Sequence, residues 1–278
     1  MGQRSDSRAV GLSLALFLVA TNSFAQAAPN RATRYLFPTD VTDARALWVN
    51  PAGLGAFPEA SINLDVTVGD PGSNGKLRQL TFGFNSRGLS FGYQRDMYSD
   101  GQQGHTYKLG IASGQAGLAA GLTGALYRGA GSGTGWDVGL RYDVTEGLIV
   151  GAAIQNIGGP HVHDSTLRVT YVPSATLLLG HQVGLSALSR LTSDGAEGYA
   201  FGARGTLGAG WKLPIGLLAR LDTDHSLRRT GFVFGVSLGG EDGAGLVATT
   251  PGDVSKIDAL SLYGVSTRRF ASPHPRPR

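Results

Sequence analysis

Hydrophobic and polar residues alternate along most of the chain between Ile62 and Phe270. In the clearest run, Trp136–Val144, every even-numbered position is apolar or aromatic, and the odd-numbered positions are Asp, Gly, Arg and Asp. A period of two is typical of a β-strand with one oily face. Similar runs pass through Leu80, Tyr107 and Phe232. The pattern predicts about fourteen strands of roughly seven to eleven residues, the strand length of membrane barrels.

Short turn sequences separate these runs. They include Asp70-Pro71-Gly72, Ser86-Arg87-Gly88, Asp100-Gly101, Glu146-Gly147 and Pro251-Gly252-Asp253. Such sequences favour tight hairpin turns, so consecutive strands are expected to pair antiparallel. An even number of hairpin-linked strands can close on itself, which removes the strand edges that lipid cannot satisfy.

The face opposite the oily one carries mostly Gly, Ala, Ser and Thr with scattered charges. A soluble β-sandwich or soluble barrel would turn its oily face inward and place large charged residues in water, so the pattern favours an outward oily face and a narrow, small-residue lumen. The predicted fold class is all-β: a membrane-spanning antiparallel up-and-down β-barrel. Lys108, Arg141, Arg204 and Arg220 are predicted to line the lumen. Because charges line most such barrels, they receive no specific role.

Residues 1–27 have the organisation of a secretion signal. Arg4 and Arg8 precede an apolar run over residues 11–20, and Ala25-Gln26-Ala27 fits the small-x-small cleavage rule, with cleavage after Ala25 as the alternative. A retained membrane anchor is disfavoured because the run is about half as long as a spanning helix. With the predicted barrel, this signal indicates the outer membrane of a Gram-negative cell.

Composition narrows the function classes. The chain has no cysteine, which excludes disulfides and thiolate chemistry. Charged residues make up 16% of the chain, few for a soluble domain. The pI near 9.5 accompanies a net charge of only +4. No basic stripe with interleaved aromatics is present, so nucleic-acid binding is not expected.

Catalytic and metal-binding patterns are weak. His161-Val162-His163-Asp164-Ser165 contains histidines and a serine, but a metal site needs three or four ligands, and we expect a polar loop. The Gly-rich stretch 129–135 lacks the Lys of a phosphate-binding loop and is expected to be a flexible hairpin loop. We therefore predict no enzyme activity, no metal and no cofactor.

The segment Ala46-Leu47-Trp48-Val49-Asn50-Pro51-Ala52-Gly53-Leu54 resembles the amino-terminal motif of the FadL-like outer membrane proteins. These include fatty acid and hydrocarbon transporters and the PorV/PorQ-type branch. Elements at residues 154–159, 172–180 and 195–205 resemble the PorV/PorQ-type branch most. The similarity spans nearly the whole chain after the signal.

The resemblance implies a division of the chain after the signal. Residues 28–60 would form a short plug or gate at the periplasmic mouth, residues 61–270 the barrel, and residues 271–278 a flexible basic tail. An ordinary turn leading into the first strand is the alternative to the plug. Asn, Pro and Gly at the first, second and fourth positions fit a type I turn. The predicted plug or gate residues are Trp48, Asn50, Pro51, Ala52, Gly53 and Leu54.

Three functions are compatible with this architecture. The first is transport of hydrophobic small molecules such as fatty acids, although the loops are shorter than those of fatty acid transporters. The second is a PorV-like scaffold for secreted proteins, and the third is a structural barrel. The expected partners are membrane lipid and lipopolysaccharide, with a hydrophobic solute or a secreted protein according to the function. In the family the last strand ends the chain, whereas here the tail follows Phe270.

Overall fold

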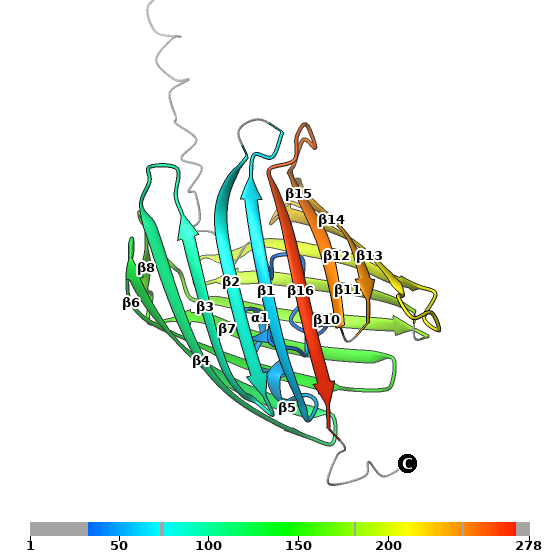
Figure 1. Cartoon of the computed structure of the whole chain (residues 1–278). Helices are drawn as coiled ribbons and strands as arrows, with labels where there is room; N and C mark the ends of the chain where they lie inside the picture. Colours follow the sequence, from blue (N-terminus) through cyan, green and yellow to red (C-terminus); the bar gives the residue numbers. More distant parts are fainter. Residues whose placement is uncertain (1–32, 73–74, 181, 241, 271–278) are drawn as a thin grey trace, which may run out of the picture.

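The computed structural model describes residues 33–72, 75–180, 182–240 and 242–270. Within them, fourteen long strands form one closed antiparallel ring (Figure 1). Strands joined in sequence pair with each other, and the first long strand pairs with the last, for example Leu64 with Gly264. The prediction of an all-β antiparallel barrel is confirmed.

The fourteen strands of the ring are β1 (Glu59–Gly69), β2 (Lys76–Ser86), β3 (Leu89–Met97), β4 (Gln103–Gln115), β5 (Leu118–Gly129), β6 (Gly131–Asp143), β7 (Leu148–Ile157), β10 (Thr170–Leu179), β11 (Val183–Thr192), β12 (Gly195–Leu207), β13 (Ile215–Asp224), β14 (Arg229–Gly239), β15 (Asp242–Pro251) and β16 (Ala259–Arg269). A small hairpin of β8 (His161–Val162) and β9 (Ser165–Thr166) lies in the connection between β7 and β10. Two short helices precede the ring, α1 (Ala46–Val49) and the 3-10 helix η2 (Pro51–Gly55). None of the helices found in the described ranges has the length and apolar character to span a membrane.

The two faces of the wall differ in chemistry. Leu109, Leu140 and Leu262 point outward and are 65%, 53% and 58% exposed. The inward positions are small or polar, as at Thr81 and Ser261, which are buried. The oily face of the sheet is therefore its outer face, as the alternation predicted.

The barrel has two distinct mouths. β1 begins and β16 ends at one of them, the lower end in Figure 1, where Glu59 pairs with Arg269. We call this the terminal mouth; the tight turns at 87–88 and 116–117 lie there too. The opposite end, here the loop mouth, carries the connection at 158–169 with the β8–β9 hairpin.

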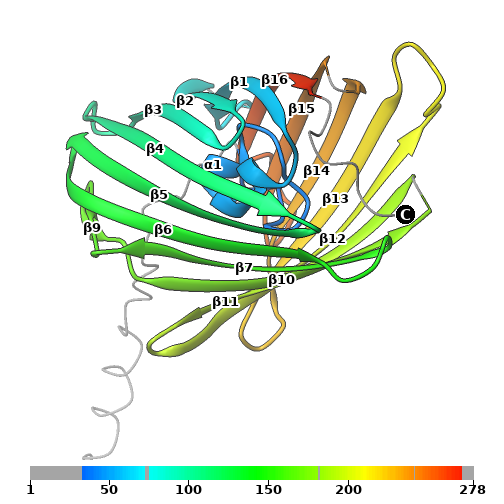
Figure 2. The same ribbon diagram turned by 90° about the horizontal axis from the view of Figure 1, so that it is seen from below.

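Residues 33–58, which we call the inner segment, lie inside the ring (Figure 2). The segment leads directly into β1 at Glu59, two positions before the predicted barrel boundary at residue 61, and the last strand ends at Arg269. Residues 28–32 of the predicted plug, the predicted signal 1–27 and the predicted tail 271–278 lie outside the described residues.

Candidate functional site in the barrel lumen

The motif found in the sequence folds into two short helical turns. Asn50 ends α1 and starts η2, where its side-chain Oδ1 accepts a hydrogen bond from the backbone N–H of Ala52 (3.1 Å). Pro51 occupies the first position of η2, which suits its fixed φ and missing N–H. The N–H of Gly53 donates to the Asn50 carbonyl (3.0 Å), the bond expected for the predicted type I turn.

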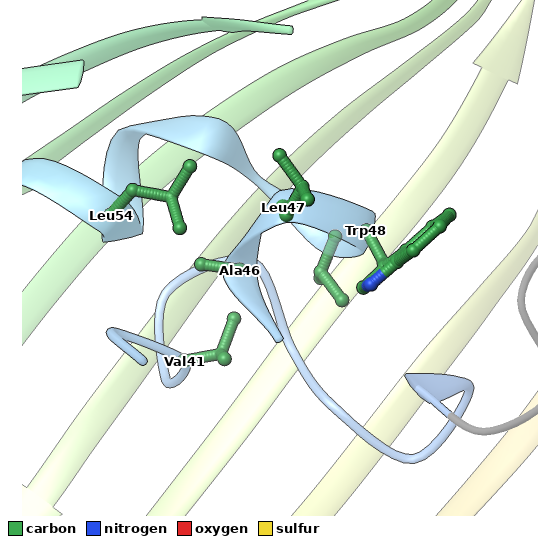
Figure 3. Packing of buried hydrophobic residues seen from close by; sticks show 6 residues of the cluster. Val41, Ala46, Leu47, Trp48 and Leu54 are labelled. Carbon is green, nitrogen blue, oxygen red and sulfur yellow. The ribbon is translucent and has the colours of Figure 1, made fainter. Parts of the chain in front are cut away.

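Apolar side chains hold the inner segment together. Leu47 and Leu54 are completely buried, and Trp48 is 8% exposed. They pack with Val41 and Ala46 (Figure 3). Burial of one such side chain is worth about 1.5–3 kcal/mol. The inner segment is thus a compact apolar unit within a polar lumen.

Glycines in the wall let this unit approach the strands closely. Gly92, Gly110 and Gly121 point inward from β3, β4 and β5. A Cβ on Gly92 would lie 2.7 Å from the Trp48 ring, and one on Gly110 would lie 2.7 Å from a Leu47 methyl carbon. A Cβ on Gly121 would meet the backbone of the segment itself, 2.7 Å from the nitrogen of Ala52. The absence of side chains at these positions is what allows the inner segment to fit against β3–β5.

Three of the four predicted lumen residues contact the inner segment backbone. Lys108 Nζ donates to the Leu47 carbonyl (3.4 Å), Arg141 Nε to the Thr39 carbonyl (3.3 Å) and Arg220 Nη1 to the Leu36 carbonyl (3.0 Å). All three are at least 93% buried. These side chains therefore satisfy carbonyl groups that the irregular segment leaves unpaired.

The fourth predicted lumen residue, Arg204, is more open. Its side chain is 47% exposed, and Nη2 lies 3.6 Å from Oδ1 of Asp40. Asp40 also accepts hydrogen bonds from Thr176 (2.7 Å) and Ser186 (2.8 Å) in the wall. Thr39 adds a hydroxyl contact of 2.7 Å with Thr176. This polar cluster joins the inner segment to β10, β11 and β12.

Each buried lumen cation also has a carboxylate partner in the wall. Lys108 Nζ lies 2.5 Å from Oδ2 of Asp137, and Arg220 Nη2 lies 2.9 Å from Oδ1 of Asp222. The Lys108 ammonium group also lies 5.3 Å from the centre of the Trp48 ring. Pairing of this kind offsets the large cost of burying a charge. The wall thereby presents fixed positive charges to the carbonyl groups of the segment.

Another ion pair lies within the inner segment itself. Arg45 Nη2 contacts Asp43 Oδ2 at 2.6 Å, and Arg45 Nη1 donates to the Tyr35 hydroxyl at 2.6 Å. Tyr35 in turn stacks on Tyr263 of β16, with ring centres 5.5 Å apart. Burial alone would raise the pKa of Asp43, but the Arg45 charge and its hydrogen bonds outweigh burial and lower it. Asp43 is therefore held as a carboxylate.

A cavity of about 500 Å³ remains beside the inner segment. Tyr35, Phe37 and Arg45 line it on one side, and β12–β14 and β16 line it on the other. Glu59 and Arg269 also belong to its lining, so the cavity lies toward the terminal mouth. The inner segment thus occupies one side of the lumen and leaves space on the other.

The histidines of the predicted polar loop lie at the loop mouth. His161 and Ser165 belong to the β8–β9 hairpin, so this stretch is a small hairpin rather than an irregular loop. His163 stacks on Tyr98 and contacts Asp100 at 2.9 Å. Among the described residues, no group of three or more His, Cys, Asp or Glu is placed to hold a metal ion.

Comparison with known proteins identifies the fold. No protein-family model and no curated protein matches the chain. Among solved structures, the Ralstonia pickettii toluene transporter TbuX aligns over 89% of this chain and 100% of its own, at 14% identity and a TM-score of 0.52. The Pseudomonas putida toluene transporter TodX aligns over 87% of this chain and 98% of its own, at 11% identity and a TM-score of 0.52.

The chain has the fold of these toluene transporters. TbuX and TodX are hydrocarbon transporters of the FadL family, so the FadL-like resemblance is confirmed at the level of fold. The finer resemblance to the PorV/PorQ-type branch stays a prediction.

Sequence reasoning missed the residues that dock the inner segment. Besides the glycines, these include Gln155, whose Nε2 donates to the Val49 carbonyl (2.7 Å), and Asn85, whose Nδ2 donates to the Leu54 carbonyl (3.3 Å). Large amides at inward positions of otherwise small-residue strands are the signal that could have pointed to them. Their partners, however, depend on the fold.

Proposed function

We propose that this protein is an outer membrane barrel through which small hydrophobic molecules pass, and that the inner segment is its gate. The single observation that carries the proposal is the segment inside the ring, held by buried contacts but with a cavity of about 500 Å³ beside it. For a solute to cross the lumen, the segment must move or the cavity must extend past it.

The outer surface supports a membrane location. Leu64, Ile111 and Leu185 belong to a broad apolar exterior and are 52%, 60% and 43% exposed. Exposed apolar patches of more than a few hundred Å² are rare on soluble monomers. In lipid the same surface is matched to its surroundings, and the closed ring leaves no strand edge to be satisfied.

The cavity supports a hydrophobic solute. Part of its lining is formed by the packed side chains of Tyr35, Leu36, Leu218 and Tyr263, and another part carries polar groups such as Asp40, Arg45 and Arg204. Its volume lies within the range of about 300–1,000 Å³ that is usual for small-molecule sites. The solved structures of the same fold are described as toluene transporters, which favours compounds of that kind or the acyl chains of fatty acids.

The gate can be tested by locking it. The hydroxyl oxygens of Thr39 in the inner segment and Thr176 in β10 are 2.7 Å apart, and the chain has no cysteine of its own. In the double variant Thr39→Cys/Thr176→Cys, a disulfide would tie the segment to the wall. We expect oxidation to stop entry of radiolabelled toluene or oleate into proteoliposomes, and reduction to restore it.

A matched control uses the same wall residue. The hydroxyl oxygen of Thr176 also lies 2.8 Å from that of Ser186 in β11. A disulfide in the double variant Thr176→Cys/Ser186→Cys would join two wall strands and leave the inner segment untied. Entry through this control should be the same when oxidised and reduced. Equal entry through the oxidised and reduced Thr39→Cys/Thr176→Cys protein would refute the gate. No entry of either solute in any state would refute transport and leave the scaffold and the structural barrel as the remaining functions.

A further inference from the structure

Three basic side chains form a row on the outer face of the barrel. Arg95 of β3 lies directly opposite His105 of β4, and His105 lies directly opposite Arg128 of β5. Directly paired residues in neighbouring antiparallel strands have Cα atoms about 4.5–5.5 Å apart. The three side chains therefore span roughly 10 Å along one level of the wall.

The alternation of the strands turns this row outward. On β3 the neighbour of Arg95 that faces inward is Gln94, which is 6% exposed. On β4 the neighbour of His105 that faces inward is Thr106, which is 5% exposed. On β5 the neighbour Tyr127 is 8% exposed and faces the lumen, whereas Arg128 is exposed. The row stands close to the loop mouth, because β4 begins at Gln103 and β5 ends at Gly129.

Among the described residues, these basic side chains have no acidic partners. No ion pair involves Arg95, His105 or Arg128 within the part of the chain that the structure describes. Their hydrogen bonds go to neutral groups instead: Arg95 Nη2 to Gln103 Oε1 (2.6 Å) and Arg128 Nη1 to the carbonyl of Tyr127 (2.9 Å). The buried lumen cations Lys108, Arg141 and Arg220, by contrast, are each paired with a carboxylate.

An apolar wall begins directly below the row, on the side away from the loop mouth. Tyr93 and Tyr107 form the next level, with ring centres 5.3 Å apart, and the Tyr93 hydroxyl lies 2.8 Å from His105 Nδ1. Further down, Leu109 and Ile111 are 65% and 60% exposed. Aromatic residues at the boundary between polar and apolar surface mark the membrane interface of such barrels. The basic row thus stands at the height of lipid headgroups.

We propose that Arg95, His105 and Arg128 bind the phosphate groups of a lipopolysaccharide molecule of the outer leaflet. This rests on the proposed outer membrane location, with the loop mouth outside, as the longer connections of such barrels are. Arginine guanidinium groups bind phosphate oxygens in a two-pronged geometry, and the imidazole adds a further nitrogen. The acyl chains of the same molecule lie on the apolar wall formed by Tyr107, Leu109 and Ile111.

Native mass spectrometry of the full barrel in detergent, titrated with purified lipopolysaccharide, tests the site. We compare Arg95→Gln and Arg128→Gln with Lys212→Gln, which removes one exposed positive charge in the turn between β12 and β13 at the terminal mouth. Loss of a charge-assisted bond costs about 1.5–3 kcal/mol, so each row variant should bind at least about tenfold more weakly than wild type. Lys212→Gln should bind as wild type does. An unboiled gel confirms that each variant has kept its barrel.

Several results would overturn the assignment. Equal affinity in the row variants and the Lys212→Gln control, or no lipopolysaccharide binding by the wild type, would remove the site. Equally tight binding of phosphatidylglycerol would show a general anionic-lipid surface instead. Solute entry measured on the same variants keeps the two proposals separate, because the row lies outside the lumen and its loss should leave entry unchanged.

Discussion

Gly121→Ala is the substitution that best tests how the inner segment is held. Gly121 faces the lumen on β5, against the peptide that joins Pro51 and Ala52. An added Cβ would meet the Pro51 carbonyl and would lie 2.7 Å from the nitrogen of Ala52. Both are backbone atoms, so no side-chain rotation can make room. The segment itself has to shift away from the wall.

The size of the effect follows from this contact. Non-bonded heavy atoms prefer separations of about 3.5–4.0 Å, so the segment must retreat by roughly 1 Å. Overpacking of this kind costs about 1–3 kcal/mol. The gain of about 0.5–1 kcal/mol from replacing a strand glycine by alanine is the same whether or not the segment is docked. The overpacking therefore destabilises only the docked state, by the full cost of about 1–3 kcal/mol. The population of undocked molecules then rises about 5- to 150-fold.

Trypsin cleavage after Arg45 reports this population. The Arg45 side chain is 15% exposed in the docked segment inside the ring, so cleavage requires the segment to leave the wall and move out of the lumen. When reclosing is fast, the cleavage rate follows the population of the open form. Mass spectrometry of the fragment that begins at Ala46 gives the rate. Gly264→Ala is the matched control, because a Cβ at Gly264 of β16 meets no atom within 4 Å.

The reasoning is refuted if Gly121→Ala and Gly264→Ala are both cleaved at the wild-type rate. That result would mean that the segment does not rest against β5. Faster cleavage in both variants would point to a general weakening of the barrel. The unboiled gel mobility of each variant separates these two cases.

Three further predictions concern the polar contacts of the segment. Asn50→Ala removes the hydrogen bond to the Ala52 N–H and leaves the carbonyl groups of Pro38 and Leu140 without this partner. The loss of about 1–3 kcal/mol should raise the rate of trypsin cleavage about 5- to 150-fold, and an unchanged rate would contradict this. Lys108→Met leaves Asp137 buried without its cation, so the free energy of unfolding measured in urea should fall by about 3–5 kcal/mol. The double variant Lys108→Met/Asp137→Leu removes the unpaired carboxylate as well and should recover most of this loss. The pKa of Asp43 is lowered below its ordinary value of 3.8 because the charge and hydrogen bonds of Arg45 outweigh burial. The Asp43 carboxylate therefore stabilises the docked segment fully above pH 3.8, and this stabilisation is lost as the pH falls through the lowered pKa. Digestion with an acid-stable protease should therefore be constant above about pH 5 and accelerate below pH 4, and the Asp43→Asn variant should show no such step.

The strand pattern could be predicted because it depends only on local sequence. In Trp136–Val144 the two faces of the strand meet different surroundings, and alternation records this directly. The position of Lys108 inside the lumen follows from the same parity. Neither inference depends on how strands that are not consecutive in sequence pair with each other.

The docking of the inner segment could not be predicted in this way. Lys108 and Leu47 are 61 positions apart, and Arg220 and Leu36 are 184 apart, so no local period joins them. Gly121 looks like any other small lumen residue until the register places Pro51 against it. The β8–β9 hairpin has strands of only two residues, too short to show a period.

The most direct test of the account is the gel mobility of the protein extracted from cell fractions. We predict that it is recovered from the outer membrane, that it migrates as a compact form when it is loaded unboiled in SDS, and that it shifts only after boiling. A soluble periplasmic protein with the same mobility before and after boiling would contradict the membrane barrel, and with it the gate and the lipopolysaccharide site.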